Sequence, residues 1–316
     1  MLKKLFVSSS PHIRSKETVS GIMRDVLIAL IPTMIMAILF FRMRAVILLL
    51  TCAISAMIIE WIIHLFFKRE IDFKDTSPII TGILLACVIP PSLPLWIAVI
   101  GVFVAIFFGK MVFGGLGHNI FNPALVGRCF LLASWPVAMT NWTNFDGVSG
   151  ATVLNTIKMH GNGAAMALFG SSGSEYLHMF LGSRLGSLGE TSTLALLIGA
   201  LYLFWRRHIS WHTPITMIAV VFILNWIVGR DPLLAIMSGG LILGAFFMAT
   251  DMVTTPKTGT GKIIFGVCAG ALVVWIRVKG GYPEGVAYAI LLMNGVTPLI
   301  DKMTKPKPFG HGGGHA

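Results

Sequence analysis

The chain has 316 residues, of which 55% are hydrophobic and only 12% are charged, and its mean hydropathy is +0.83. Soluble globular domains carry about 25% charged residues, so this composition excludes an ordinary soluble protein and indicates a membrane protein. The net charge of +11 does not indicate nucleic-acid binding, because the basic residues are scattered between apolar segments, as the positive-inside bias of membrane proteins predicts.

About ten transmembrane helices are predicted, because ten apolar runs approach the roughly 20 residues that one span requires. In chain order they are 26–41, 45–67, 79–93, 95–113, 120–139, 193–205, 214–229, 232–249, 262–276 and 285–300. The third, fifth and eighth runs are less uniform, since Pro, Gly or polar residues interrupt them. The expected fold is an all-α polytopic membrane protein in which residues 1–316 form a single membrane domain.

The distribution of Lys and Arg predicts how the chain crosses the membrane. Residues 1–20 lack an apolar stretch followed by a cleavage site, so no removable signal peptide is expected. With ten spans and the N-terminus inside, the inside segments hold 16 Lys and Arg residues and the remainder of the chain holds 8. This excess predicts a cell (inner) membrane protein whose N-terminus (1–20) and tail (301–316) are both cytoplasmic. The segment 140–192 then forms a loop on the outer face.

Two interrupted stretches, about half the chain apart, suggest an internal repeat. One begins at Asp75 and ends at Pro90-Pro91, and the other begins at Asp231 and ends at Ala249-Thr250-Asp251. Because five spans is an odd number, two five-helix halves would have inverted orientations, and matched interruptions are typical of broken helices around a midplane site. The alternative is two unrelated interruptions, since Gly and Pro are frequent in membrane helices.

The polar segment 140–192 contains the string Asp146-Gly147-Val148-Ser149-Gly150-Ala151-Thr152. It resembles the flavin-attachment signature Asp-x-x-(Ser/Thr)-Gly-Ala-Thr, whose final threonine carries FMN through a phosphoester bond. The resemblance makes Thr152 the expected attachment residue, with Asp146, Ser149, Gly150 and Ala151 as the rest of the motif. An exposed loop on the outer face would be accessible to a modifying enzyme. The alternative is that Ser149 caps a short helix beginning at Ala151.

Several further stretches carry a resemblance that extends over nearly the whole chain. They are residues 10–14 (SPHIR), 22–26 (IMRDV), 81–86 (TGILLA) with Pro90-Pro91, 117–124 (GHNIFNPA), 186–192 (GSLGETS) and 248–251 (MATD). The chain resembles the family of the Rnf complex D subunit and the B subunit of the sodium-pumping NADH:quinone oxidoreductase. The SPHIR start and the short N-terminus fit the Rnf branch better, while Met252 departs from the proline expected after the Ala-Thr-Asp.

The resemblance implies a specific function. Thr152 would carry covalent FMN, and the chain would relay electrons between flavins or iron–sulfur centres while electron transfer between ferredoxin and NAD drives Na⁺ or H⁺ translocation. It would need the other Rnf subunits (A, B, C, E and G), membrane lipid and a flavin transferase as partners. A second, non-covalent flavin such as riboflavin is also implied, without residues to hold it. The chain by itself is not expected to be a complete enzyme, because no NAD or ferredoxin site is recognisable.

Ionisable residues inside apolar runs are candidates for an ion pathway, because charges at membrane depth are costly and usually functional. Glu60 has two open interpretations: an ion-pathway role, or a pair with Lys or Arg from another helix. Asp251 closes an apolar run and could bind a cation together with nearby carbonyl groups. Lys110 is expected near the inner interface, with its side chain extended toward it.

Asn119 and Asn122 are weaker candidates for cofactor binding. Asn122-Pro123 predicts a helix start, with an Asn cap and Pro at the first helical position, and a flavin-pocket wall is a second role for both asparagines. No catalytic residues and no metal ligands are predicted. Cys52, Cys87, Cys129 and Cys268 are far apart in apolar runs and are expected to be buried apolar residues.

Two rival functions remain open from the residues alone. One is the quinone-reducing B subunit, and the other is a channel or secondary transporter built on the same repeat. Broken helices serve a pump, a pore or a transporter equally well. The flavin motif favours a redox protein, because flavin carries electrons and a pore does not require an outward-facing attachment signature.

Overall fold

The computed structural model describes residues 18–68, 75–143, 149–150, 152–161, 175–182 and 186–306. In this part of the chain nearly all regular structure is helical, which confirms the predicted all-α membrane fold. Most of the predicted termini, and the motif residues Asp146 and Ala151, lie outside the described residues. The predicted sidedness of the termini stays a prediction.

The helices of the N-terminal half begin and end where local sequence signals predict. They are α1 (Val19–Phe41), α2 (Met43–Phe66), α3 (Ser77–Val88), α4 (Leu95–Ile106) with the π-helical η1 (Phe107–Met111), α5 (Pro123–Ser134) and α6 (Pro136–Thr140). The backbone of Arg42, at φ 51°, turns the chain between α1 and α2. At the start of α5, Asn122 Oδ1 accepts a hydrogen bond from Leu125 N (3.3 Å) behind Pro123. The predicted Asn cap with Pro at the first position is therefore confirmed.

The C-terminal half contains one helix that is broken in its middle. The helices are α10 (Thr193–Trp205), α11 (His212–Ile227), α12 (Pro232–Met237), α13 (Leu241–Leu243) with the π-helical η2 (Gly244–Met248), α14 (Gly259–Lys279) and α15 (Val286–Thr304). Asp231 caps α12 by accepting from Leu233 N and Leu234 N at 2.9 and 3.1 Å. Gly239, at φ +67°, lies in the break between α12 and α13 and adopts a conformation that favours glycine.

Each of the ten predicted runs has a helical counterpart in the expected order. The three interrupted runs are the ones that the structure shortens or divides: α3 ends before Pro90-Pro91, Pro136 separates α5 from α6, and α12 breaks before α13. Three helices, α1, α2 and α14, are long and apolar enough to cross a membrane by themselves. The number of crossings and the inverted repeat remain predictions.

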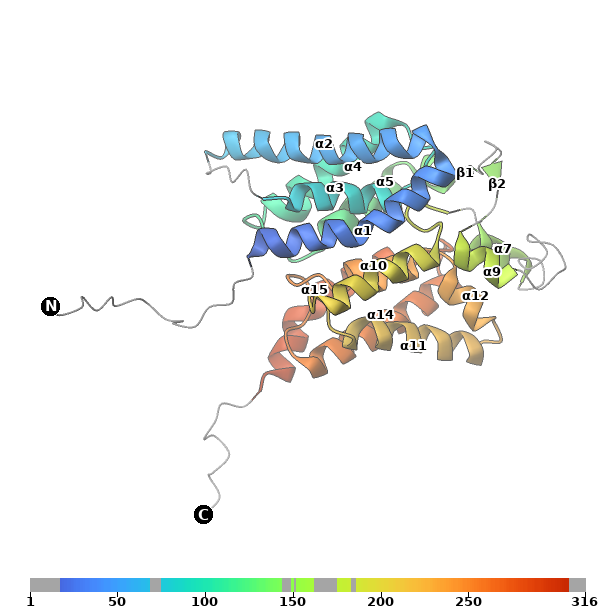
Figure 1. Cartoon of the computed structure of the whole chain (residues 1–316). Helices are drawn as coiled ribbons and strands as arrows, with labels where there is room; N and C mark the ends of the chain where they lie inside the picture. Colours follow the sequence, from blue (N-terminus) through green and yellow to red (C-terminus); the bar gives the residue numbers. More distant parts are fainter. Residues whose placement is uncertain are drawn as a thin grey trace, which may run out of the picture.

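The two halves of the chain form two groups of helices (Figure 1). Helices α1 to α5 make one group and α10 to α15 the other, and α1 packs on α10 between them. We call the end of the bundle where α1 begins and α15 ends the terminal end. The opposite end, the loop end, carries α7 (Val153–His160), α9 (Glu175–Leu181) and the short antiparallel pair of β1 (Trp142–Thr143) and β2 (Ser149–Gly150). The predicted outer loop therefore contains regular structure, at the end opposite the described chain ends.

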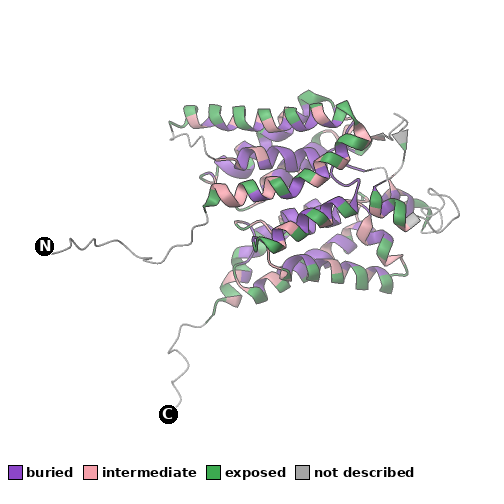
Figure 2. Ribbon diagram, viewed as in Figure 1, coloured by how far each residue is buried: buried purple, intermediate pink, exposed green. Residues whose placement is uncertain are grey.

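Burial follows the arrangement of the two groups (Figure 2). Helix α3 is buried along nearly its whole length, whereas α1 and α2 expose apolar side chains such as Leu39 and Leu50 on their outer faces. Exposed apolar surface along long helices suits contact with lipid. Cys52 and Cys87 are buried as expected, but Cys129 is half-buried and Cys268 is exposed on α14.

A buried carboxylate joins the two halves near the terminal end. Asp25 of α1 accepts hydrogen bonds from Tyr202 Oη (2.9 Å) and Arg206 Nε (2.9 Å) and contacts His208 Nε2 at 2.6 Å. The carboxylate is only 7% exposed, and its three partners come from α10 and the turn after it. Burial of a charge is costly unless it is paired and hydrogen-bonded, which this arrangement provides.

The close approach of α1 and α10 depends on Gly199. A Cβ atom at Gly199 would lie 2.0 Å from Ala29 O and 3.0 Å from Phe247 Cζ, so Gly199→Ala forces the backbones apart. We expect a loss of about 1–3 kcal/mol of stability, visible as a lower melting temperature of the purified protein. Gly281→Ala is the matched control, since a Cβ there meets nothing within 4 Å. Equal melting temperatures for the two variants would contradict this prediction.

Candidate functional site

Thr152 lies at the start of α7, at the loop end. Its Oγ1 accepts a hydrogen bond from Asn155 N (3.3 Å), so Thr152 is the helix cap. The alternative in which Ser149 caps a helix from Ala151 is wrong, because Ser149 pairs with Thr143 in the β1–β2 ladder and the helix begins at Val153. Gly150, the residue beside it in β2, is exposed.

Thr152 faces a cavity of about 270 Å³, which we call the loop-end cavity. Ligand pockets usually begin near 300 Å³, so the volume is at the lower limit for a small organic group. The residues that line it come from α5, α6, β1, α7, the segment before α10, the α12–α13 break and the segment before α15. They are Arg128, Leu132, Met139, Thr140, Trp142, Thr152, Val153, Leu154, Asn155, Gly186, Glu190, Ser238, Gly239, Tyr282, Pro283 and Glu284.

Helix α7 is held in place by apolar and polar contacts. Val153 and Ile157 pack with Met179 of α9 and Leu234 of α12 in a small buried cluster. Lys158 Nζ, near the other end of α7, donates to the carbonyl oxygens of Gly280, Gly281 (3.1 Å) and Tyr282 (3.3 Å). The helix that carries Thr152 is therefore tied to the segment that carries Tyr282 and Glu284.

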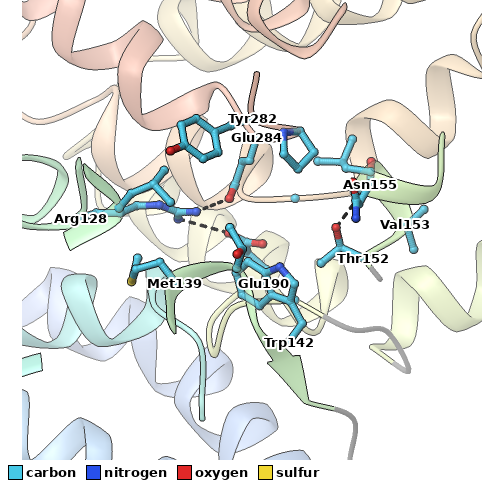
Figure 3. A pocket seen from close by; sticks show the side chains of 16 residues that line it. Arg128, Met139, Trp142, Thr152, Val153, Asn155, Glu190, Tyr282 and Glu284 are labelled. Atoms are coloured by element: carbon cyan, nitrogen blue, oxygen red, sulfur yellow. Dashed lines mark hydrogen bonds and ion pairs between the residues drawn. The ribbon is translucent and has the colours of Figure 1, made fainter. Parts of the chain in front are cut away.

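Three charged side chains meet on one wall of the cavity (Figure 3). Arg128 Nη1 lies 3.5 Å from Glu190 Oε1, and Arg128 Nη2 donates to Glu284 Oε2. Arg128 and Glu190 are almost completely buried, at 6% and 2% exposure. Because Arg128 belongs to α5 and Glu284 to the segment before α15, this cluster joins the two halves at the loop end, as Asp25 does at the other.

Two charged side chains, Arg277 and Glu284, cap the two sides of the α12–α13 break. Arg277 Nη1 and Nη2 donate to Ala235 O (2.6 Å) and Ser238 O (3.2 Å) at the end of α12. Gly240 N, at the start of α13, donates to Glu284 Oε1 (2.8 Å). A guanidinium thus meets the carbonyl end of one short helix and a carboxylate meets the N–H end of the next, the arrangement that helix-end polarity favours.

The two glutamates differ in their affinity for protons. Burial raises the pKa of Glu190 to about 7, and the neighbouring Glu284 acts in the same direction while Arg128 opposes it. Burial also acts to raise the pKa of Glu284, but Arg128, a hydrogen bond with Glu190 and the Gly240 N–H outweigh it and lower the pKa. The pair therefore gains or loses one proton near neutral pH.

A buried polar atom of the loop-end cavity fits a hydrogen-bonding ligand. Ser238 is 1% exposed and lines the cavity, yet its Oγ has no hydrogen-bond partner within the described chain. Buried polar atoms normally have a partner, so a ligand or water is expected there. Trp142 and Tyr282 supply aromatic surface. These residues suit a planar aromatic group with hydrogen-bonding atoms, and a flavin ring is one such group.

Asn119, Asn122 and Asp251 do not lie near Thr152. They line a second cavity of about 120 Å³, the terminal-end cavity, together with Lys110 and His208. Asp251 lies in the turn after η2, where its carboxylate accepts from Val253 N (3.4 Å) and Thr254 Oγ1 (3.2 Å). The asparagines therefore cannot wall a pocket around Thr152, and any binding role concerns a separate site.

Glu60 forms the tertiary pair that one of its two interpretations predicts. Its carboxylate oxygens accept from Lys110 Nζ at 2.7 and 2.8 Å. Lys110 is 2% exposed and also donates to Ser77 Oγ at 2.6 Å, so the expectation of a side chain extended to the interface is wrong. The π-helical turn of η1 directs Lys110 toward α2 and α3 rather than outward.

Comparison with known proteins covers nearly the whole chain. Residues 6–310 match the model of the NQR2, RnfD, RnfE family. The chain belongs to this family. Over 98% of its length it is 47% identical to the D subunit of the proton-translocating ferredoxin:NAD(+) oxidoreductase complex of Clostridium ljungdahlii, covering 97% of that protein. It is 43% identical over 97% of its length to the D subunit of the Na(+)-translocating counterpart of Acetobacterium woodii, covering 95% of that protein. The D subunit of the ion-translocating oxidoreductase complex of Escherichia coli is 35% identical over 96% of this chain, which covers 98% of that protein.

Four charged residues of this family member were not predicted as site residues. They are Arg128, Glu190, Arg277 and Glu284. Except for Arg277 and Glu284, they are distant in sequence, and only the fold brings them together around the α12–α13 break and the loop-end cavity. One signal was present: Glu190 lies in residues 186–192, one of the stretches on which the resemblance rests, in an otherwise apolar and small-residue environment. A charged residue of that kind is a candidate for function.

Proposed function

We propose that this chain is the membrane-embedded electron-transfer component, the D subunit, of an Rnf-type complex that couples ferredoxin:NAD oxidoreduction to Na⁺ or H⁺ translocation. The observation that carries the proposal is the similarity, at 47% and 43% identity over nearly the full length, to the D subunits of two such complexes. One relative is named as proton-translocating and the other as Na(+)-translocating, so the proposal includes both ions. The remaining Rnf subunits (A, B, C, E and G) would supply the ferredoxin and NAD sites.

The proposal places the protein in the cell (inner) membrane with both termini in the cytoplasm. The excess of Lys and Arg in the inside segments supports this orientation. The described chain begins and ends at the same end of the bundle, and α7 lies at the other end. The loop-end cavity would then face the outer side, within reach of a flavin transferase.

We further propose that Thr152 carries FMN through a phosphoester bond. Its Oγ1 lies at the N-terminus of α7, where free N–H groups and the helix dipole favour a phosphate. Residues of the loop-end cavity would hold the flavin ring: Trp142 and Tyr282 by aromatic contact, and Arg128 and Ser238 by polar contact. Flavin would supply a group that accepts and donates one or two electrons, while the chain supplies position and charge. Asp146, Ser149, Gly150 and Ala151 would serve recognition by the transferase.

The residues of the terminal-end cavity have a separate proposed role. Asp251 would contribute to an ion pathway at that end. Glu60 would contribute through Lys110, which lines the cavity and donates to the Glu60 carboxylate. Asn119 and Asn122 would contact a second, non-covalent flavin such as riboflavin only in this cavity, because neither lines the loop-end cavity.

Replacement of Thr152 tests the attachment. The full chain, coexpressed with a flavin transferase, should give a flavin-fluorescent band on a denaturing gel, and Thr152→Ala should abolish it because no other atom replaces Oγ1. Thr156→Ala is the matched control, since Thr156 is one turn later in the same helix and its Oγ1 donates to Thr152 O (3.2 Å). A band that persists in Thr152→Ala would place the flavin elsewhere.

The alternatives give different results in the same preparation. A purified complex that reduces quinone instead of NAD would indicate the B subunit of the sodium-pumping NADH:quinone oxidoreductase. A colourless protein that transports a solute alone in liposomes would indicate a channel or secondary transporter. The names of the relatives favour the Rnf assignment over both.

A further inference from the structure

We propose that Glu190 and Glu284 form an acid pair that takes up one proton when an electron arrives in the loop-end cavity. The inference rests on the proposed attachment of FMN to Thr152. It adds that two carboxyl groups of this chain, beside the cofactor, compensate the charge of reduction.

The two carboxyl groups converge on one point of the backbone. A Cβ atom at Gly240 would lie 2.7 Å from Glu190 Oε1 and 2.8 Å from Glu284 Oε1. The two carboxyl groups therefore approach the α12–α13 break from two different segments, and a Cβ at Gly240 would have to displace the ends of both side chains.

The charged groups around the pair are two carboxylates and two guanidinium groups. The charged and titratable groups that face Glu190 are Arg128 of α5, Glu284 before α15, Arg277 of α14 and Cys87 of α3. Arg128 contacts both carboxylates, whereas Arg277 donates to carbonyl groups at the end of α12. The two guanidinium groups and the two carboxylates therefore balance before an electron arrives, and a further negative charge in the cavity favours uptake of a proton by the more deeply buried carboxylate, Glu190.

The pair lies beside the proposed flavin position. Glu190, Glu284 and Thr152 line the same cavity, and Figure 3 shows the Glu190 side chain between Arg128 and Thr152. A negative charge that arrives in a buried cavity raises the pKa of a nearby carboxylate, because charges interact strongly where water is excluded.

The step balances in charge and atoms. Glu190 forms an O–H bond with a proton from bulk water as one electron arrives from a reduced flavin or iron–sulfur centre of a neighbouring subunit, which is thereby oxidised. The cavity gains one electron and one proton, so its net charge is unchanged. When the electron leaves, Glu190 returns the proton.

The first test measures the one-electron midpoint potential of the flavin on the full chain from about pH 6 to pH 9, a range that brackets the Glu190 pKa of about 7. Below that pKa Glu190 is already protonated and takes up no further proton. Above it, we expect the wild-type potential to fall by up to about 59 mV for each tenfold decrease in proton concentration. Glu190→Gln should lose this slope, while Glu190→Asp, which keeps an acid, should retain it.

A slope that is unchanged in Glu190→Gln would place the proton on the flavin itself and overturn the proposal. If Glu190→Gln does not fold, Glu284→Gln gives a second test: loss of the neighbouring carboxylate lowers the pKa of Glu190, so the fall in potential should begin at a lower pH, and an onset that does not move would overturn the acid pair. The potential is measured only on protein that shows the flavin-fluorescent gel band. Loss of that band would contradict the flavin attachment, whereas the slope of the potential against pH tests the acid pair.

A second readout does not require flavin. In the Thr152→Ala protein, infrared spectra recorded against pH should contain the C=O band of a protonated carboxyl group that disappears as the pH rises through about 7. The band should be absent after the further change Glu190→Gln. A spectrum without a carboxyl group that titrates near neutral pH would overturn the acid pair, whatever the outcome for FMN.

Discussion

Arg128→Met is expected to destabilise the protein by about 3–5 kcal/mol, because it leaves buried carboxylates without their cation. Arg128 is 6% exposed and contacts Glu190 and Glu284 from two different segments. Methionine fills much of the space left by the arginine, so the loss should come from charge and not from a cavity. The measurement is the melting temperature of the purified protein in detergent, together with the yield from membranes.

Removal of the carboxylates should restore stability to this variant. In the Arg128→Met background, adding Glu190→Gln and then Glu284→Gln replaces each uncompensated charge by a neutral amide of similar size. We expect stepwise recovery, because each amide removes a buried charge that Arg128 no longer balances. If neither change restores stability, Arg128 acts through packing and the electrostatic account is wrong.

The helices could be predicted from the sequence because their signals are local. Apolar runs determine the ten segments, and Pro90-Pro91, Pro136 and Gly239-Gly240 determine where three of them end or break. The position of Thr152 at a helix start also follows from nearby residues, since threonine is a good cap. The capping residue is Thr152 and not Ser149, the alternative that the sequence offered, because Ser149 is paired in a strand.

The candidate site could not be predicted in the same way, because its members are distant in sequence. Glu190 and Glu284 meet over Gly240 only when α12 breaks and the segments before α10 and α15 pack on that break. Asn122 shows the converse case, because residues of one helix can line different sites. Helix α5 runs between the two cavities, so that Asn122 at its start and Arg128 further along it line different sites.

Lys110 shows a further limit of local sequence signals. A lysine close to the end of an apolar run normally extends to the interface, and nothing beside it in sequence indicates a partner. Its partner Glu60 is 50 residues earlier, on a helix that packs against η1. Ser77 and Asp75, at the start of α3, also contact Lys110, with Asp75 Oδ2 3.5 Å from the ammonium group.

Lys110→Met is the second change with a large expected effect, a loss of about 3–5 kcal/mol, because it removes the ammonium group that hydrogen-bonds the buried Glu60 carboxylate and leaves only His64 Nε2, 3.8 Å away, beside it. A lysine extended to the interface would instead be replaced at little cost. Lys257→Met is the matched control, since Lys257 is exposed and its backbone N–H donates to Asp301 near the end of α15; surface changes of this kind stay within about 0.5 kcal/mol. Melting temperatures of the two variants in detergent decide between the two accounts.

The double variant Lys110→Met/Glu60→Gln separates the charge of the pair from its packing. Because the amide removes the uncompensated charge, we expect most of the lost stability to return. The same variant also tests the proposed ion pathway: it should fold, yet complexes that contain it should move fewer ions for each electron transferred if Glu60 contributes to that pathway. A stable double variant with unchanged ion movement would make the pair structural and leave Asp251 as the remaining candidate at the terminal end.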